Sequence, residues 1–257
     1  MCRHLAYLGP SRSLASLLHD ADHSLAAQSQ HPRHQEPGAT NADGWGVGWW
    51  DRSQRAEPAL FRSAAPIWAD RSFRSVAGLT RSTAIVAAAR RATPPLPIVA
   101  SGNAPFASGP WLFSLNGFVS EFGSRIGDQL HRTVSPSRAA GIDRDHDSQV
   151  LFAMVLDRLD HGASSAAAMG SVIAQVLADG EGKLNLLLSD GHAIVATTWR
   201  NSLFSLADSG VATGGVLLAS EPLDDDTAWT LIPDGSLVEA SGTTVTVTPL
   251  LPHRGSA

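Results

Sequence analysis

The sequence is poor in several residue types, and each shortage excludes a class of protein. Its single cysteine, Cys2, cannot form an internal disulfide, which is typical of a reducing compartment. No apolar run approaches the roughly 18 residues needed to span a bilayer, and the opening segment MCRH lacks the charged-then-apolar layout of a signal peptide. The formal net charge of -5 offers no basic surface for nucleic acid. These absences favour a cytoplasmic protein without nucleic-acid or membrane partners; a homo-oligomer is left open.

What is present is the composition of a folded globular protein. The chain has 257 residues and a mass of 27.0 kDa, with 43% hydrophobic and 17% charged residues. That length suits one large domain or at most two small ones. Because no linker, repeat or low-complexity segment interrupts the chain, we expect a single domain over residues 2–257, with Met1 removed.

Hydrophobic periodicity predicts strands on either side of a pair of helices. Strands are expected at 4–9, 45–50, 58–63, 84–89 and 111–115, and from Lys183 onward at 183–190, 193–199, 202–207, 216–222 and 243–250. Helices are expected at 11–28, 147–161 and about 165–178, with irregular chain at 28–41 and 92–110. This order favours antiparallel sheets with packed helices, an α+β fold, over alternating βαβ units.

Cys2 is the first residue with a chemical interpretation. A small side chain at position two normally permits removal of Met1, which leaves Cys2 with a free α-amine beside its own thiol. That amine, with an ordinary pKa of about 7.7–8.0, suits a general base near neutrality, and an N-terminal amine can activate its own nucleophile. A chance cysteine near a terminus is the alternative interpretation.

Two polar motifs follow predicted strands. Arg90-Arg91-Ala92-Thr93 follows the strand 84–89, where a guanidinium could bind a carboxylate in bidentate fashion, although an ordinary surface pair of arginines is equally compatible. Asn116-Gly117 is expected to stop the strand 111–115. An Asn amide and the next backbone N–H can form a pair of oxyanion donors, but taken alone this dipeptide favours a hairpin turn.

Two further motifs also have both a structural and a functional interpretation. NADGWGVGWW, residues 41–50, places three glycines among tryptophans, which indicates close approach of the backbone to another group, or else a turn into a core strand with packed tryptophans. Asp147-Ser148 begins the predicted helix 147–161, where both residues are ordinary N-caps. A functional role requires Asp147 to bind a cationic group.

Taken in order, these motifs resemble the class II glutamine amidotransferases. The resemblance rests on a cysteine at the mature N-terminus followed by DGWG, R-x-A-T, N-G and D-S before a helix, and it extends to ASEPLDDD at 219–226 with Trp229 just after it. It covers essentially the whole chain. It implies the four-layer αββα N-terminal-nucleophile (Ntn) hydrolase fold, in which two packed antiparallel sheets lie between helices.

The resemblance also implies roles for the reacting groups. Cys2 would be the nucleophile and its α-amine the base, and the Asn116 amide with the Gly117 N–H would form the oxyanion hole. Arg90 and Thr93 would hold the α-carboxylate of a γ-glutamyl substrate, and its α-ammonium would lie against a carboxylate, that of Asp147. No metal or organic cofactor is implied.

A narrower resemblance is to the stand-alone amidohydrolases of ergothioneine biosynthesis, which remove glutamate from γ-glutamyl-hercynylcysteine S-oxide. It rests on MCRHLAYLG, NADGWGVGWW, RSAAPIWAD and ASEPLDDD. The chain is expected to end near the end of the hydrolase domain, which favours hydrolysis over ammonia transfer. For the trimethylammonium of the leaving group, Trp45, Trp49 or Trp68 could supply a cation–π face, with core packing expected for at least two of them. Arg3 and Arg91 are candidates for its carboxylates.

One residue departs from the family pattern: Leu115 stands where a histidine usually precedes Asn-Gly. We expect altered packing there rather than lost activity. Two alternatives stay open, a free-standing glutaminase subunit that supplies ammonia to a partner and an inactive γ-glutamyl-binding relative. A metal enzyme is not favoured, because the histidines lack ligand spacing and Asp224 to Asp226 have the pattern of a solvated turn.

Overall fold

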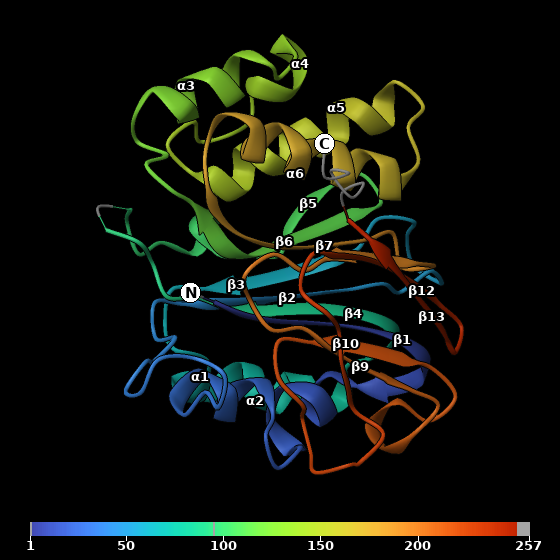
Figure 1. Cartoon of the computed structure of the whole chain (residues 1–257). Helices are drawn as coiled ribbons and strands as arrows, with labels where there is room; N and C mark the ends of the chain where they lie inside the picture. The colour runs from blue at the N-terminus through green and yellow to red at the C-terminus, as the bar shows by residue number, and fades with distance from the viewer. Residues whose placement is uncertain (1, 95, 251–257) are drawn as a thin grey trace.

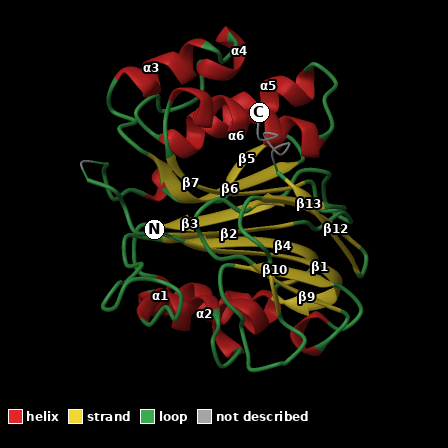
Figure 2. Cartoon of the chain, in the orientation of Figure 1, coloured by secondary structure: helices red, strands yellow, loops and turns green. Residues whose placement is uncertain are grey.

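The computed structural model describes residues 2–94 and 96–250, which form four layers (Figures 1 and 2). Two antiparallel sheets lie face to face, and helices cover both outer faces. This arrangement confirms the predicted α+β fold with two packed sheets between helices. No helix in the described part of the chain has the length and apolar composition needed to span a bilayer.

The seven-stranded sheet has the order β11-β9-β10-β1-β4-β2-β3. Its strands are β1 (Arg3–Ser13), β2 (Trp45–Trp49), β3 (Ala59–Ser63), β4 (Arg81–Ala89), β9 (Phe204–Ala207), β10 (Val216–Ala219) and β11 (Thr230–Leu231). The six-stranded sheet has the order β13-β12-β8-β7-β6-β5. Its strands are β5 (Phe106–Ser108), β6 (Trp111–Val119), β7 (Gly182–Ser189), β8 (Ile194–Thr197), β12 (Ser236–Ser241) and β13 (Thr244–Pro249).

Helices α1 and α2 cover the seven-stranded sheet, and α3 to α6 cover the other (Figure 1). The α-helices are α1 (Leu25–Gln30), α2 (Arg71–Leu79), α3 (Arg125–Arg132), α4 (Pro136–Ala139), α5 (Asp147–Asp160) and α6 (Ser165–Asp179). Short π and 3-10 segments are η1 (Ser16–Asp20), η2 (Ile67–Ala69), η3 (Ala100–Gly102) and η4 (Gly210–Ala212).

Three apolar layers hold the four structural layers together. Between the sheets, small and branched side chains such as Ala6, Val86 and Leu187 are almost fully buried. A second cluster joins α5 and α6 to the six-stranded sheet, and a third joins η1, α1 and α2 to the seven-stranded sheet. The alanine-rich run at the end of β4 lies between β1 and β2, which explains why all of residues 84–89 are buried.

The structure confirms most of the predicted elements and corrects others. The predicted helix over 11–28 is wrong, because β1 continues to Ser13 and the following leucines are divided between η1 and α1. Ser24 caps the second of these helices by accepting a hydrogen bond from Ala27 N, so a new helix starts where periodicity indicated continuity. Helices α2 and α3 and strand β12 lie in segments without a predicted element.

Polar contacts tie the two sheets together beneath the start of β1. His4 Nδ1 lies 3.2 Å from Ser114 Oγ on the facing strand β6. Ser220 Oγ accepts hydrogen bonds from His4 N at 3.0 Å and from Asn116 Nδ2 at 3.2 Å. Asn116 on the six-stranded sheet is therefore linked through Ser220 to His4 on the seven-stranded sheet, and His4 is two residues after Cys2 in the chain.

Candidate active site

Cys2 immediately precedes β1, a central strand of the seven-stranded sheet. Its side chain is half-buried and lines a cavity of about 640 Å³. Its carbonyl oxygen accepts hydrogen bonds from Arg3 Nε at 2.8 Å and Gln35 Nε2 at 3.4 Å. The backbone at the thiol is thus held from two sides, while the thiol itself reaches an open space.

The same cavity brings together four other predicted site residues from distant parts of the chain. Arg90 and Thr93 line it from the end of β4 and the loop beyond, Gly117 from β6, and Asp147 from the start of α5. Its volume is typical of a small-molecule site. A γ-glutamyl group placed here would have a thiol, a guanidinium and a carboxylate around it.

Asn116 and Gly117 do not form the turn that the dipeptide favoured, nor do they stop the strand. Both lie inside β6 and pair with Asn185 and Leu184 of β7. Asn116 is fully buried and does not itself line the cavity, and one N–H of its amide is donated to Ser220 Oγ, which leaves the second N–H for another acceptor. Gly117 has φ +156°, and a Cβ there would overlap the carbonyl oxygen of Lys183 on β7, so the position requires glycine.

Arg90 is a buried cation with unused hydrogen-bonding capacity. Its side chain is only 7% exposed, its Nη1 donates to Pro97 O at 3.1 Å and lies 3.5 Å from Asn103 Oδ1, and its Nη2 has no partner among the described residues. Arg90 N also donates to Gly44 O, which extends the pairing of β4 with the DGWG segment. A buried guanidinium with free N–H groups is a site for an anion.

Asp147 is the first residue of α5, and its carboxylate points back toward β6. Oδ2 accepts from Val119 N at 3.1 Å, and Oδ1 accepts from Ser148 N at 2.6 Å. His146, one residue earlier, places its ring Nδ1 3.9 Å from the same Oδ1. Asp147 therefore links β6 to the start of α5, and it lines the cavity together with His146.

The loop at 100–104 approaches β2 closely, and this explains two glycines of the DGWG segment. A Cβ on Gly46 would lie 2.6 Å from Ala104 O, and Gly44, with φ +105°, lies against Asn103. Close backbone approach, one of the two interpretations of this motif, is therefore observed. The packed-tryptophan interpretation holds as well, because Trp45 is fully buried between Phe61 and Phe73.

Two predicted binding residues lie elsewhere. Trp45 belongs to the core below the seven-stranded sheet and does not line the cavity, so the prediction that it contacts substrate is corrected. Arg3 is 1% exposed and its Nη1 donates to Glu221 Oε1 at 2.6 Å, so it is not available to a substrate carboxylate. Arg91, in contrast, is exposed and lines the cavity. Trp49 is half-buried against the same core, and Trp68 is 37% exposed.

Glu221, in the ASEPLDDD segment, anchors the start of the chain and the loop below it. Its carboxylate accepts four hydrogen bonds, from Arg3 Nη1, His23 Nε2, Arg33 N and His34 N. Burial alone would raise the pKa of Glu221, but these donors outweigh burial and hold the pKa below its ordinary value. The sequence offered this residue only as part of a motif, because its partners lie 187 to 218 residues away.

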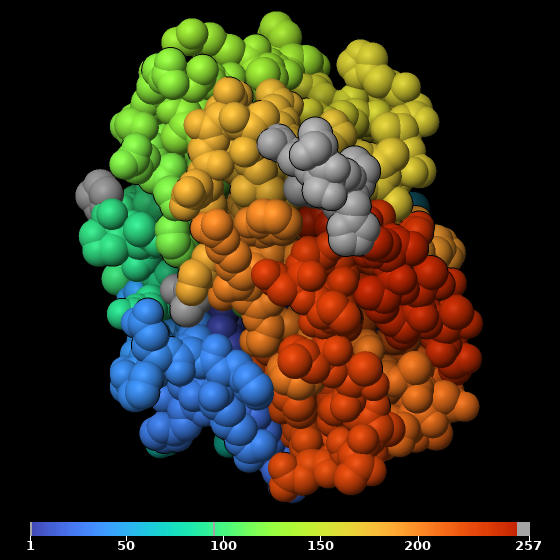
Figure 3. Space-filling model, in the orientation of Figure 1, coloured from blue at the N-terminus to red at the C-terminus, as the bar shows by residue number. Residues whose placement is uncertain are grey.

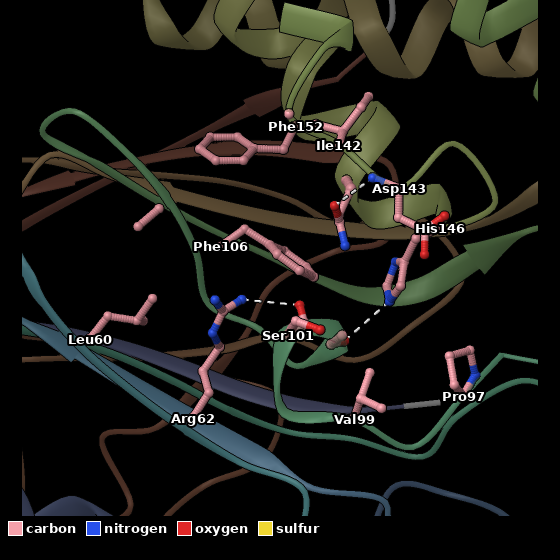
Figure 4. A pocket seen from close by; sticks show the side chains of 14 residues that line it. Leu60, Arg62, Pro97, Val99, Ser101, Phe106, Ile142, Asp143, His146 and Phe152 are labelled. Atoms are coloured by element: carbon pink, nitrogen blue, oxygen red, sulfur yellow. Dashed lines mark hydrogen bonds between the residues drawn. The ribbon is translucent and has the colours of Figure 1, made fainter.

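Further hollows lie outside the main cavity. A groove of about 510 Å³ runs between segment 34–36 and segments 200–202 and 231–234, between the blue and orange regions of Figure 3. A cavity of about 360 Å³ lies on the far side of His146 and is lined by Arg62, Phe106 and Asp143 (Figure 4). A void of about 30 Å³, lined by both Cys2 and His146, lies beside the main cavity.

Comparison with known proteins agrees with this fold. The sequence model of the family described as glutamine amidotransferases class-II matches residues 19–208. The chain belongs to the class II glutamine amidotransferases. It is 42% identical over 252 residues to the gamma-glutamyl-hercynylcysteine sulfoxide hydrolase of Mycolicibacterium smegmatis, covering 97% of this chain and 100% of that one. It is 41% identical over 251 residues to the protein of the same name from Mycobacterium tuberculosis, covering 97% of each.

Solved structures support the fold. A glutamine aminotransferase class-II domain protein from Silicibacter pomeroyi has a TM-score of 0.69 at 24% identity, covering 98% of this chain and 100% of that one. The glutamine phosphoribosylpyrophosphate amidotransferase of B. subtilis has a TM-score of 0.67 at 13% identity, covering 97% of this chain and 49% of that one. These likenesses bear on the fold alone, and they agree with the predicted αββα Ntn layering.

Proposed function

We propose that this chain hydrolyses the γ-glutamyl amide of γ-glutamyl-hercynylcysteine S-oxide, releasing glutamate and hercynylcysteine S-oxide. The observation that carries the proposal is the 42% identity along 97% of the chain to a curated hydrolase named for this substrate. The cavity supports it, because Arg90 and Asp147 offer opposite charges to the α-carboxylate and α-ammonium of a glutamyl group.

In the proposed mechanism, the Cys2 thiolate attacks the γ-carbonyl carbon. The free N–H of the Asn116 amide and the Gly117 N–H stabilise the tetrahedral oxyanion, and losing one such donor typically costs about 2.7–4 kcal/mol. The α-amine of Cys2 takes the thiol proton and gives it to the leaving nitrogen as the C–N bond breaks. This requires removal of Met1, which lies outside the described residues. Water then hydrolyses the γ-glutamyl thioester without a cofactor.

The proposal extends to the setting of the reaction. We infer one catalytic domain over residues 2–257, because no linker, repeat or low-complexity segment interrupts the sequence, and a cytoplasmic location, on the grounds of the single cysteine. A free-standing glutaminase would use the same residues, so glutamine is the comparison substrate that separates the two activities.

The experiment measures glutamate release by mass spectrometry from γ-glutamyl-hercynylcysteine S-oxide and from glutamine, side by side. We expect strong preference for the hercynyl substrate, and in Cys2→Ala a loss on the order of 10⁴-fold or more. Thermal unfolding of Cys2→Ala close to the wild-type temperature is the control for folding. Preference for glutamine would reassign the chain to the ammonia-supplying class, and normal turnover by Cys2→Ala would refute the nucleophile.

A further inference from the structure

His146 is a buried histidine that the proposed mechanism does not use. It directly precedes α5, its side chain is 7% exposed, and its ring packs edge-on against Phe106 with centroids 5.5 Å apart. The ring lies between the start of α5 and the loop that carries Gly102, toward which Nε2 points (Figure 4). His146 also lines the main cavity together with Cys2 and Asp147.

The partner of Nε2 fixes which nitrogen carries the proton. Nε2 lies 3.1 Å from Gly102 O, and a carbonyl oxygen can only accept, so Nε2 bears the hydrogen. Burial is the largest influence on the His146 pKa and lowers it; Asp147 opposes this, and Arg90 adds to it. The ring is therefore neutral near pH 7, and Nδ1 presents a lone pair.

This lone pair faces a carboxylate rather than a donor. Nδ1 has no hydrogen-bond partner within the described residues and lies 3.9 Å from Asp147 Oδ1. Among the described residues, Asp147 accepts hydrogen bonds from Val119 N, Ser148 N and Ser148 Oγ but forms an ion pair with no group other than His146, and a neutral imidazole does not compensate its charge. The Nδ1 lone pair of His146 and the negatively charged Asp147 Oδ1 thus lie beside each other on one wall of the cavity. A buried acceptor without a donor typically costs about 1–3 kcal/mol.

The group that fits this pair is a cation with several N–H donors. A nitrogen about 2.9 Å from both acceptors would see them roughly 85° apart, which two N–H bonds of one ammonium can serve with nearly straight hydrogen bonds. A neutral donor would leave the charge of Asp147 uncompensated. The glutamyl portion of a substrate carries one such group, its α-ammonium.

We propose that His146 is a specificity residue whose Nδ1 accepts a hydrogen bond from the α-ammonium, beside Asp147 Oδ1. The inference rests on the proposed function in taking a γ-glutamyl group as the ligand. Gly102 couples this site to the carboxylate site, because its carbonyl holds His146 while a Cβ on it would lie 2.8 Å from Arg90 Nη1. The position of Gly102 therefore affects the distance between His146 and Arg90, the side chains proposed to bind the α-ammonium and the α-carboxylate of the glutamyl group.

The test compares substrates that differ only in the α-amino group. The pairs are γ-glutamyl-hercynylcysteine S-oxide with its glutaryl analogue, and glutamine with glutaramate. His146→Phe keeps the aromatic contact with Phe106 but has no acceptor, whereas His146→Asn keeps an acceptor near the place of Nδ1. His161→Phe is the matched control, because His161 follows the other end of α5, where its Nδ1 lies 2.6 Å from Asp157 O.

We expect His146→Phe to raise KM for the α-amino substrates by about 10–100-fold, the worth of one hydrogen bond to a charged group. Its KM for the glutaryl analogues should rise at least about tenfold less than for their α-amino partners, because the analogues lack the donor, whereas any effect of losing the bond to Gly102 O is common to both members of a pair. His146→Asn should restore most of the KM, and His161→Phe should match the wild type. Equal loss on both members of a pair, or no loss on either, would overturn the inference.

A binding measurement separates this inference from the proposed function. Calorimetric titration of Cys2→Ala, and of Cys2→Ala with His146→Phe, uses L-glutamate and glutarate as the probes. Tighter binding of L-glutamate than of glutarate, by a margin that shrinks with His146→Phe, supports the site even if no γ-glutamyl-hercynyl compound is turned over. Equal affinity of Cys2→Ala for the two probes would overturn the role of His146 and leave the reaction itself to be judged by the glutamate-release assay.

Discussion

Replacing Gly117 by alanine tests whether β6, which carries the proposed oxyanion donors, requires a residue without a side chain at this position. A Cβ at this position would overlap Lys183 O and lie 2.5 Å from the Lys183 carbonyl carbon, whereas ordinary contact begins near 3.4 Å. Strands β6 and β7 would have to separate at this pair, and overpacking of this kind costs about 1–3 kcal/mol. The φ of +156° adds about 1–3 kcal/mol of strain for a residue with a side chain.

These costs lead to two measurable effects. The two costs together are about 2–6 kcal/mol, and at about 2–4 °C per kcal/mol for a chain of this size the Tm is expected to fall by roughly 4–24 °C in a thermal unfolding scan. The rate of glutamate release should fall about 10²–10³-fold, because the Gly117 N–H moves away from the oxyanion.

Gly78→Ala is the matched control for the same chemical change. Gly78 lies in α2, and a Cβ there would meet nothing within 4 Å. Alanine should stabilise this helix by about 0.5–1 kcal/mol and leave activity unchanged. If Gly117→Ala unfolded at the wild-type temperature and kept the wild-type rate, the argument from close approach to β7 would be wrong.

Acidification is expected to destabilise the fold through His4, because burial, reinforced by Arg3, lowers the pKa of His4 from 6.5 to about 3. Between those pH values the unfolded chain binds a proton that the folded chain does not, so the free energy of unfolding should fall by about 1.4 kcal/mol per pH unit, about 4–5 kcal/mol in all. Urea unfolding from pH 6.5 to 4 measures this slope, and His4→Leu should show a shallower one; identical slopes would contradict the assignment. Glu221→Gln is expected to cost about 3–5 kcal/mol, because an amide cannot accept all four hydrogen bonds and Arg3 loses its buried counter-charge. Urea unfolding measures the loss of unfolding free energy in Glu221→Gln. The rate of Cys2 alkylation by iodoacetamide should also rise. If stability and alkylation rate both stayed at the wild-type values, the Glu221 carboxylate would not hold the start of the chain.

Some site residues were predictable because their signal is local. Cys2 behind the initiator methionine, Arg90 at the end of an apolar run and Asp147 at a helix start are visible as residue type plus position. The structure places all three on one cavity. Periodicity likewise located β4, α5 and α6, because burial on one face, or on both, repeats at the period of the element.

Other features were not predictable, because their causes are distant in sequence. Asn116-Gly117 has the composition of a turn, yet pairing with β7 keeps both residues extended. In the sequence Arg3 has no evident partner, whereas in the structure it pairs with Glu221, which is 218 residues away. His146 has no signal of its own, because the loop at Gly102 both buries its ring and selects its protonated nitrogen.

The sequence by itself determined most of the elements, their antiparallel arrangement and the chemical types available for reaction, because periodicity, turn residues and a lone cysteine are properties of neighbouring positions. Only the tertiary structure decided which side chains share a space. Trp45 turned into the core and Arg91 toward the cavity, although both adjoin predicted site motifs. The physical reason is that strand register and sheet packing are fixed by contacts between segments far apart in the chain, and a single residue of register moves a side chain to the opposite face.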